Sequence, residues 1–302
     1  MPESAPHMSS SRATLIGFMA ILLWSLLSLL TVASGTVPPF QLAAMTFSIG
    51  GTLGAASLML RPGATDTLRR QLSAQPWQVW ALGVGGLFGY HALFFLALRL
   101  APPAEAQLVN YSWPLLIVLF SALLPGERLK WQHVAGALIA LAGTAVLFFG
   151  RGGISFAQAY LPGFAAAFVA AFTWAVYSVA SRRFAAVPTG TVAGFCLATA
   201  ALAAICHVAF EQTHWPQSGA QWLAVLGLGI GPVGIAFYVW DVGMKHGDIR
   251  ILGAGSYLAP LLSTAFLVLA GYAAASLTLA LAAVLVAGGG ILAAKDMVVR
   301  RD

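Results

Sequence analysis

The chain has 302 residues, of which 60% are hydrophobic and 8% are charged, and its mean hydropathy is +0.86. Soluble domains carry about a quarter charged residues, so this sequence has too few polar side chains to coat the two soluble domains that its length would allow. Lipid is therefore expected to surround most of the surface, and the net charge of +6 is not a sign of a nucleic-acid partner.

Ten segments are apolar over about 20 residues, the length that a helix needs to cross the hydrocarbon core of a bilayer. The first is too long for the apolar part of a signal peptide, and it has a counterpart later in the chain. In chain order the segments cover residues 13–33, 39–60, 78–98, 104–124, 132–150, 161–181, 188–209, 221–243, 251–271 and 275–294. We therefore expect an all-α integral membrane protein with ten transmembrane helices.

The connections between these segments are short, and none has room for a soluble domain. The longest, residues 61–77, has room for a short surface helix. Cys196 and Cys206 lie in one segment and would be about 15 Å apart at the rise of an α-helix, which is too far for a disulfide. We expect both to act as small apolar core residues.

Positive charges lie in alternate connections. If the N-terminus is inside, only Arg99 and Arg151 of the 15 Lys and Arg residues fall outside. The others are Arg12, Arg61, Arg69, Arg70, Arg128, Lys130, Arg182, Arg183, Lys245, Arg250, Lys295, Arg300 and Arg301. Because positively charged loops stay in the cytoplasm, we expect a multi-pass protein of a bacterial inner membrane with both termini cytoplasmic.

The two halves of the sequence resemble each other. GFMAILLWSLLS aligns with AFVAAFTWAVYS, which sets Trp24 over Trp174. NYSWPLLIVLFSALL aligns with SYLAPLLSTAFLVLA, which sets Pro114 over Pro260. Two such matches in chain order indicate an internal repeat.

We expect one repeat at 13–150 and the other at 161–295, together forming one transport unit. Each repeat holds five spans, an odd number, so the two halves cross the membrane in opposite senses. Inverted repeats are the architecture of many secondary transporters, in which the substrate site lies near the midplane between the halves.

These repeats, together with the stretch PGERLKWQHVAGALIALAGTAVLF that closes the first one, resemble the drug/metabolite transporter superfamily and its EamA repeat. GYHALFFLAL and NYSWP resemble the YddG-type aromatic amino-acid exporters. The resemblance implies ten helices and the export of aromatic and other neutral amino acids by alternating access. Glu127 departs from repeat symmetry, because Ala273 stands at the matching position of the second half.

Ionisable side chains are rare in the apolar segments. His91 is the only one near the middle of its segment, whereas Asp241 and Glu105 lie near segment ends, where we expect water or headgroups to reach them. Without buried cations, a carrier of phosphorylated sugars is disfavoured. Without embedded carboxylates, an ion-driven pump is disfavoured as well, and no P-loop indicates direct use of ATP.

Tyr and Trp residues at mid-depth need partners for their OH and NH groups, so they suit a cavity wall, with core packing as the alternative. Tyr111 and Trp113 lie about 200° apart on a helix and share one cavity only if Pro114 distorts the turn. The candidates for the cavity wall are Trp24, Tyr90, His91, Asn110, Tyr111, Trp113, Trp174, Tyr177, Tyr238, Ser256 and Tyr257. The residues expected in the interfacial belts are Trp77, Trp80, Trp131, Trp215 and Trp222.

Three other features have more than one interpretation. His91 is a proton-coupled gate, a neutral hydrogen-bonding wall residue or a packing residue. Glu127 and Arg128 are interpreted as a solvated cytoplasmic turn or a helix cap. The small-residue stripe of Gly136, Ala140 and Thr144, with the thin last segment at 288–290, serves packing within the chain or a dimer face.

Pro114 and Pro260 are expected to kink their helices. A proline leaves the carbonyl four residues earlier without its partner, which here means the carbonyls of Asn110 and Ser256. Two such acceptors facing each other would hold a substrate ammonium. The alternative is that the prolines only bend the helices.

The leading functional prediction is a secondary transporter that exports amino acids and related small compounds through a central aromatic cavity. The alternative is a drug or toxic-cation efflux carrier of the same superfamily, and a remote one is an intramembrane enzyme built on His91 and Ser256. No enzyme activity, metal or cofactor is expected. The partners expected are a small-molecule substrate, either an amino acid or a cationic drug, and the lipid bilayer, with no nucleic acid and no obligate protein partner.

Overall fold

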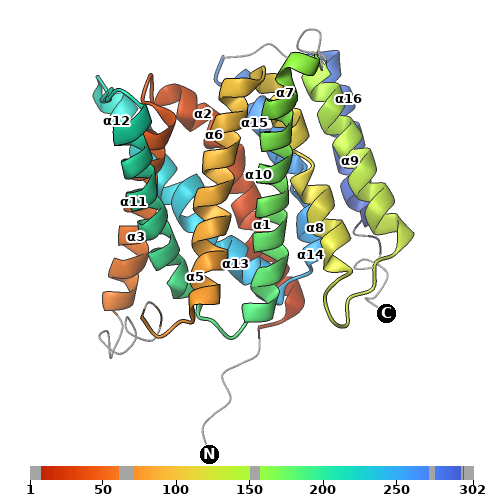
Figure 1. Cartoon of the computed structure of the whole chain (residues 1–302). Helices are drawn as coiled ribbons and strands as arrows, with labels where there is room; N and C mark the ends of the chain where they lie inside the picture. Colours follow the sequence, from red (N-terminus) through yellow and green to blue (C-terminus); the bar gives the residue numbers. More distant parts are fainter. Residues whose placement is uncertain are drawn as a thin grey trace, which may run out of the picture.

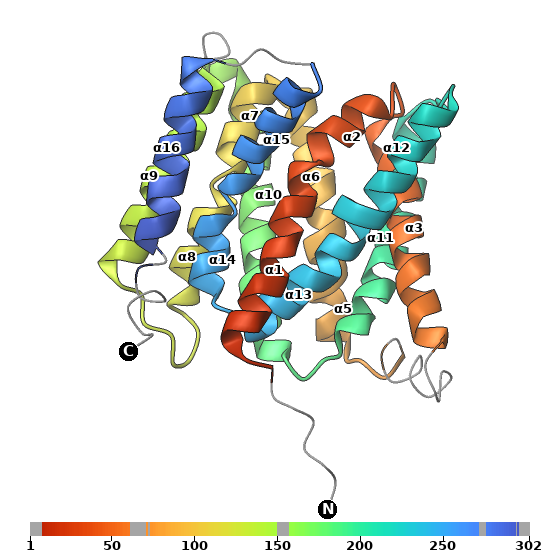
Figure 2. The same cartoon turned by 180° about the vertical axis from the view of Figure 1, so that it is seen from behind.

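The computed structural model describes residues 8–60, 71, 73–149, 157–271, 276–293 and 295. Throughout these residues the regular structure is helical, and they contain no strand. The helices run side by side as one bundle (Figure 1), which Figure 2 shows from behind. The surface helix expected at 61–77 lies largely outside the described residues. The residues Arg61, Arg69, Arg70, Arg151, Ala273, Arg300 and Arg301 also lie outside them.

Eight helical stretches of the described chain are long and apolar enough to cross a membrane. They are Ser10–Ala33, Pro39–Met59, Trp77–Leu100, Trp131–Phe149, Gln158–Phe184, Thr189–Phe210, Gly219–His246 and Ile249–Leu269. Each coincides with one of the ten apolar segments of the sequence. The chain is therefore an all-helical, multi-pass membrane protein.

The two remaining segments are also helical but shorter. Segment 104–124 is divided into α7 (Pro103–Asn110) and α8 (Trp113–Ser121), and segment 275–294 forms α16 (Leu277–Ala293). The division falls at Tyr111 and Ser112, and Trp113 separates it from Pro114. Proline lacks the N–H that would continue the helix ladder and clashes with the preceding turn, so the helix restarts with Pro114 as its second residue.

Two other long stretches are also interrupted, the first at Leu26 without a proline and the second before a proline. The first is α1 (Ser10–Ser25) followed by α2 (Leu27–Ala33). The second is α14 (Ile249–Gly255) followed by α15 (Leu258–Leu269), where the break precedes Pro260. The expected kinks at both prolines are thus present as interruptions of the helix.

Two stretches contain a π-helical turn. One runs through α5 (Trp77–Val84), η2 (Gly85–Gly89) and α6 (Tyr90–Leu100). The other runs through α12 (Gly219–Ile230), η6 (Gly231–Ile235) and α13 (Ala236–His246). Glycine in both turns and proline in the second weaken the ordinary α ladder. Such bulges are frequent at functional sites.

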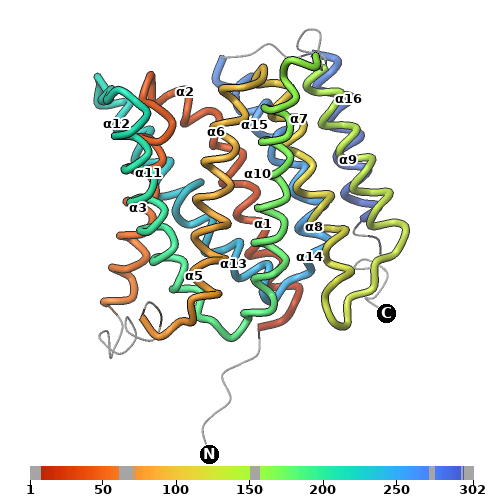
Figure 3. The backbone as a smooth tube through the Cα atoms, viewed as in Figure 1, coloured from red at the N-terminus to blue at the C-terminus, as the bar shows by residue number. Residues whose placement is uncertain are grey.

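The remaining helices complete the bundle, whose course is traced in Figure 3. Among them, α10 packs on α6, and α3 packs on α11. Their bounds are α3 (Pro39–Met59), α9 (Trp131–Phe149), η3 (Gln158–Tyr160), α10 (Leu161–Ala180), η4 (Ser181–Phe184), η5 (Thr189–Thr191) and α11 (Val192–Phe210).

The small-residue stripe packs within the chain. A Cβ added to Gly136 would lie 2.5 Å from the carbonyl oxygen of Gly289, and one added to Gly289 would lie 2.5 Å from that of Gly136. Both distances are too short for any side chain, so α9 and α16 touch backbone to backbone at this point. Gly288 and Gly290 meet nothing within 4 Å, so they do not take part in this contact.

The interfacial tryptophans divide into two groups. Trp77, Trp131, Trp215 and Trp222 are exposed near helix ends, as membrane-interface residues are. Trp80, one turn from Trp77, is half-buried, and its ring lies 5.5 Å from that of Phe195 and packs on the main core. Cys196 and Cys206 are free, as expected.

Candidate functional site

Four tryptophans from four helices meet in the centre of the bundle. Trp24 of α1 lies 6.2 Å from Trp113 of α8, 5.6 Å from Trp174 of α10 and 5.0 Å from Trp240 of α13, measured between ring centroids. The other three lie within 6.3 Å of one another. We call Trp24, Trp113, Trp174 and Trp240 the tryptophan cluster. Most of the contacts are edge-to-face, the geometry that aromatic quadrupoles favour.

Two hydrogen bonds fix rings of the cluster. The Trp24 Nε1–H donates to the carbonyl of Pro232 at 3.1 Å, and that carbonyl belongs to the π-helical turn η6. The Trp240 Nε1–H donates to the Ser178 hydroxyl at 3.1 Å. Buried indole N–H groups need such partners, so the π turn and the serine set the orientation of both rings.

Further aromatic side chains surround the cluster. The rings of Tyr90 and Tyr177 lie 5.5 Å and 5.2 Å from Trp174. The Asn110 side-chain amide donates to the Tyr90 hydroxyl at 3.0 Å, while its buried Oδ1 has no hydrogen-bond partner among the described residues. A buried polar atom left without a partner requires an explanation, and a substrate or a water molecule would provide one.

His91 is fixed within aromatic surroundings. Its Nδ1 lies 2.7 Å from the Leu87 carbonyl in η2, which can only accept, so Nδ1 carries a proton. Its ring is 5.0 Å from Phe47, 6.0 Å from Phe95 and 6.4 Å from Phe237. This environment has no described carboxylate beside the ring, and it fits the neutral wall or packing interpretation better than the proton-coupled gate.

Four predicted site residues lie away from the cluster. Tyr111 packs on Phe148 of α9 with centroids 6.1 Å apart, on a different side of its helix from Trp113. Tyr257 is fully buried in a second cluster between α8, α9, α14 and α16. Tyr238 faces α3, where its hydroxyl donates to the Gly50 carbonyl at 3.1 Å. The break before Pro114 therefore did not bring Tyr111 and Trp113 onto one face.

Ser256 is the fourth, and the hypothesis that its carbonyl is free is wrong. The Ala259 N–H donates to this carbonyl at 3.0 Å, because the helix tightens into a turn directly before Pro260. The Ser256 hydroxyl donates to the Leu252 carbonyl at 2.6 Å. The expected pair of proline-freed acceptors is therefore lost on this side.

The aromatic rings fill the centre of the bundle in this structure. Of two pockets found among the described residues, neither is walled by the tryptophan cluster. One is a lipid-side groove between α7, α9 and α10, and the other lies beside Tyr177 and Asp241. The tryptophan rings contact one another at the place where the sequence predicted an open cavity.

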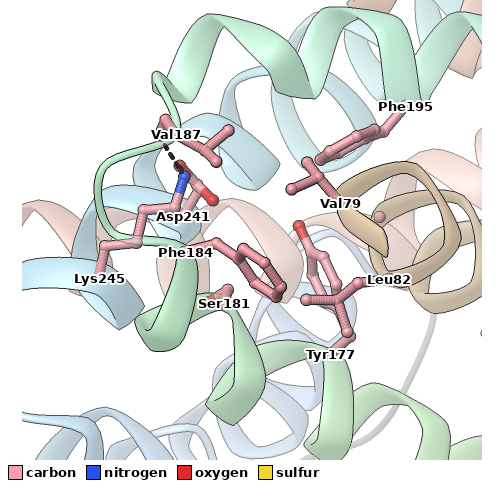
Figure 4. Close-up of a pocket in the computed structure, with 10 residues that line it drawn as sticks. Val79, Leu82, Tyr177, Ser181, Phe184, Val187, Phe195, Asp241 and Lys245 are labelled. Atoms are coloured by element: carbon pink, nitrogen blue, oxygen red, sulfur yellow. Dashed lines mark hydrogen bonds and ion pairs between the residues drawn. The ribbon is translucent and has the colours of Figure 1, made fainter. Parts of the chain in front are cut away.

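Asp241 and Lys245 form a buried ion pair next to that second pocket (Figure 4). The Lys245 Nζ lies 2.8 Å from the Asp241 Oδ2, and the side chains are 5% and 3% exposed.

The expectation that water reaches Asp241 and Glu105 is wrong, since both are buried. Position along a helix gives depth but does not tell which face turns inward. Among the described residues no His, Cys, Asp and Glu cluster is suited to a metal ion.

A second charge network joins three chain segments at the end of the bundle where α1 begins. Glu127 lies 3.6 Å from Arg182 and 3.6 Å from Arg250, so it bridges two cations and is not merely a solvated turn. Arg182 also donates to the carbonyls of Met244 and Gly247 at the end of α13. Cations are favoured at a helix C-terminus.

Asp248, in the same network, is the N-cap residue of α14. Its carboxylate accepts from the Arg250 N–H at 3.0 Å and forms an ion pair with the Arg250 guanidinium at 2.8 Å. Burial by itself raises the pKa of Asp248, but the hydrogen bonds from Arg250 and from the backbone outweigh it and hold this pKa below its ordinary value.

The opposite end of the bundle has its own buried glutamate. Glu211, with a side chain 2% exposed, accepts from the backbone N–H groups of Phe40 and Gln41 at 3.1 Å, at the start of α3. It also lies 3.0 Å from His207 and 3.5 Å from Arg99. A carboxylate is favoured at a helix N-terminus, where backbone N–H groups lack partners.

The sequence analysis missed several members of the site. Trp240, Phe237 and Phe47 pack into or beside the tryptophan cluster. Phe237 could have been found from the repeat. At the offset that aligns Pro114 with Pro260, Phe237 aligns with His91, which was already a candidate. For the buried pair of Asp241 and Lys245, the four-residue spacing was the available signal.

Long apolar helices around a buried aromatic and polar centre define a polytopic membrane carrier. The EamA-like transporter family model matches residues 11–149 and 161–295, and the chain belongs to this family. It is 62% identical to the aromatic amino acid exporter YddG of Ancylobacter novellus, over 95% of this chain and 98% of that protein. It is 31% identical to the exporter of the same name from Salmonella typhimurium, over 94% and 97%. A solved crystal structure with 61% identity matches it with a TM-score of 0.87, covering 94% of this chain and 99% of that one.

Proposed function

We propose that this chain exports aromatic and other neutral amino acids across a bacterial inner membrane by alternating access. The observation that carries the proposal is the 62% identity, over nearly the whole length, with a protein named as an aromatic amino acid exporter. The tryptophan cluster supports it, because four indole rings from helices of both halves offer the stacking surfaces that an aromatic side chain needs.

The proposed architecture is ten spans arranged as two inverted repeats. Besides the eight long stretches, α7 with α8 and the shorter α16 supply the two further spans. The π turns η2 and η6 occupy matching places in the two halves. Gly143 packs on Val286, and Gly289 packs on Ala140. The offset that aligns Pro114 with Pro260 also aligns Gly143 with Gly289 and Ala140 with Val286, so the two contacts are repeat equivalents. These features support a pseudo-twofold axis between α9 and α16.

We propose that both termini are cytoplasmic. The charge distribution of the loops supports this orientation, and α1 begins at the same end of the bundle at which α16 ends (Figure 2). Reporter fusions at either terminus test it. A reporter that is active only outside the cytoplasm is expected to stay silent at both ends, and a signal at either end would refute the orientation.

In this proposal the substrate site lies at the tryptophan cluster and the structure is a closed state. Ring-to-ring contacts are worth about 0.5–1.5 kcal/mol each, so a substrate ring can replace them at little net cost. Tyr90 and Asn110 line the same centre, and the unpartnered Oδ1 of Asn110 is an acceptor for a substrate donor.

The buried carboxylate of Asp241 is the one observation that favours the alternative, an efflux carrier for toxic cations. Lys245 neutralises this carboxylate at 2.8 Å, so the site as a whole has no net negative charge. A neutral or zwitterionic substrate therefore fits the interior better than a cation does.

Counterflow tests the proposal. Purified protein in liposomes loaded with unlabelled L-phenylalanine, without any ion gradient, is expected to accumulate labelled L-phenylalanine from outside. An organic cation tested in parallel is expected to be exchanged poorly. Exchange that begins only when a pH gradient is imposed would contradict transport without an ion gradient. It would favour the interpretation of His91 as a proton-coupled gate. No exchange of any amino acid under either condition would refute the proposed function.

A further inference from the structure

The ion pair of Asp241 and Lys245 is not explained by the tryptophan cluster. The two residues lie on successive turns of α13, in a stretch that crosses the membrane, and both are buried. Removing two charges from water is costly, and their mutual attraction does not by itself guarantee a net gain in stability. Ionisable residues inside a membrane protein are therefore functional candidates by default.

Two neighbours hold this ion pair in place. The Lys245 Nζ donates to the Val187 carbonyl at 2.9 Å, and the Thr189 hydroxyl donates to the Asp241 Oδ2 at 2.7 Å. Among the described residues, Lys245 thus uses two of its three donors, and the contacts of Asp241 all fall on Oδ2. Both charged groups keep capacity for a further partner.

The ion pair borders a small pocket with aromatic walls (Figure 4). Phe184, Phe195 and Tyr177 line it, and its volume of about 20 Å³ leaves room for one water molecule. Tyr177 forms both a wall of this pocket and a contact with Trp174 of the tryptophan cluster. The pocket therefore adjoins the cluster on the side of the positively charged end of the bundle.

We propose that Asp241, Lys245 and this pocket form an entry site for the zwitterionic amino acid before it reaches the tryptophan cluster. The substrate ammonium binds the Asp241 carboxylate, the substrate carboxylate binds the Lys245 ammonium, and the substrate ring lies against Phe184 and Phe195. The inference rests on the proposed function, because it assigns a second site to the same amino-acid substrate.

Charge balance is the physical reason for this assignment. One carboxylate and one ammonium 2.8 Å apart carry no net charge, and a zwitterion brings one group of each sign at a similar separation. Exchange of the internal pair for two substrate contacts leaves no buried charge unpaired. A lone cation or anion would leave Lys245 or Asp241 without a partner, which is strongly unfavourable in a buried site.

The present pocket is too small for an amino acid, so it must widen when substrate enters. Its floor is formed in part by residues 181–187, the connection between α10 and α11. This connection consists of η4 (Ser181–Phe184), a short helical turn that continues the stretch of α10, followed by residues 185–187, which are not helical. Movement of this segment opens the pocket without separating the long helices.

The test compares three probes in the liposome counterflow assay: L-phenylalanine, 3-phenylpropionate, which lacks the ammonium, and 2-phenylethylamine, which lacks the carboxylate. Wild-type protein is expected to prefer L-phenylalanine to both analogues. Asp241→Asn is expected to reduce the preference over 3-phenylpropionate at least about tenfold, because a charge-assisted hydrogen bond is lost. Lys245→Gln is expected to do the same for the preference over 2-phenylethylamine.

Two further variants keep the test decisive. Because a single change leaves one buried charge unpaired and can impair folding, the double variant Asp241→Asn/Lys245→Gln provides a neutral, hydrogen-bonded pair of similar shape. It is expected to fold and to lose both preferences. Arg183→Gln removes an exposed charge from the neighbouring turn and is expected to keep both.

The outcomes separate this inference from the proposed function. If wild-type protein exchanges L-phenylalanine but the double variant keeps both preferences, or slows all three probes alike, the entry site is refuted and the pair is structural. If wild-type protein exchanges none of the probes, the proposed function fails and the entry site with it.

Discussion

The four tryptophans at the centre of the bundle contact one another through ring faces and edges. At each end of the bundle, by contrast, a glutamate links several chain segments: Glu127 at one end and Glu211 at the other. Ring contacts are individually weak and tolerant of direction. The carboxylate contacts are directional, and at Glu211 they include two backbone N–H groups at 3.1 Å. If the proposed function is correct, we expect the centre to bind the substrate ring and the carboxylate contacts to hold the two ends of the bundle closed.

The two ends also differ from each other. The Glu211 side chain is 2% exposed and accepts two close backbone hydrogen bonds, while that of Glu127 is 20% exposed and makes ion pairs of 3.6 Å. Long, partly exposed ion pairs contribute little free energy and are screened by salt. The end that holds Glu127 is therefore expected to part more readily than the end that holds Glu211.

The largest expected effect comes from the centre. Trp113→Ala and Trp174→Ala should weaken the apparent affinity for L-phenylalanine roughly two- to thirtyfold, since a stacking or cation–π contact is worth about 0.5–2 kcal/mol. Counterflow at several substrate concentrations measures this. Trp174→Phe keeps an aromatic ring and should lose less, and the exposed Trp222→Ala should behave as wild type. Normal transport by both alanine variants would exclude the cluster as the site.

The next effect concerns the cap at Glu211. Glu211→Gln removes the negative charge at the start of α3 and should lower the free energy of unfolding by about 0.5–2 kcal/mol, as loss of an N-terminal cap does. Thermal unfolding of the purified protein in detergent reports it as a lower melting temperature. A melting temperature equal to that of wild type would show that this carboxylate does not stabilise its end of the bundle.

Glu127→Gln provides the matched comparison. Its ion pairs are long and partly exposed, so we expect a loss of at most about 1 kcal/mol. This loss should shrink as salt is raised, because salt screens such pairs. If Glu127→Gln destabilises the protein more than Glu211→Gln does at every salt concentration, the proposed difference between the two ends is reversed.

The smallest effect is a pH dependence at Asp248. The pKa of this carboxyl is below its ordinary value of 3.8 in the folded protein, so its contribution to stability is present above that pH and is lost as the pH falls through the folded value. Asp248→Asn should therefore flatten the loss of thermal stability on the acid side of about pH 4. If the melting temperature of Asp248→Asn falls with decreasing pH as steeply as that of wild type, groups other than Asp248 cause the loss of stability in acid.

Apolar length was enough to predict the helical segments, since the bilayer requires a run of apolar residues of known length. Trp24, Trp113 and Trp174 could also be selected as central residues, because the repeat aligned two of them. Which way each side chain turns could not be predicted. Tyr238 and Trp240 are two residues apart on one helix, yet one faces α3 and the other the cluster.

The same limitation explains the errors on charge. Asp241 stands near the end of its segment, where the sequence favours exposure, but α13 turns this face toward the connection at 187–189. The carbonyl of Ser256 was expected to be free because of Pro260, but the chain closed a tighter turn before the proline. Local tightening of this kind depends on tertiary packing and leaves no clear pattern in the sequence.

A crystal structure of this protein grown with L-phenylalanine tests the central claim most directly. The account predicts that the substrate ring lies between Trp24 and Trp174, with these rings farther apart than the 5.6 Å found here, and that the amino acid contacts Asn110 or Tyr90. A ligand bound elsewhere while the four rings keep their present contacts would contradict the assignment of the tryptophan cluster as the substrate site.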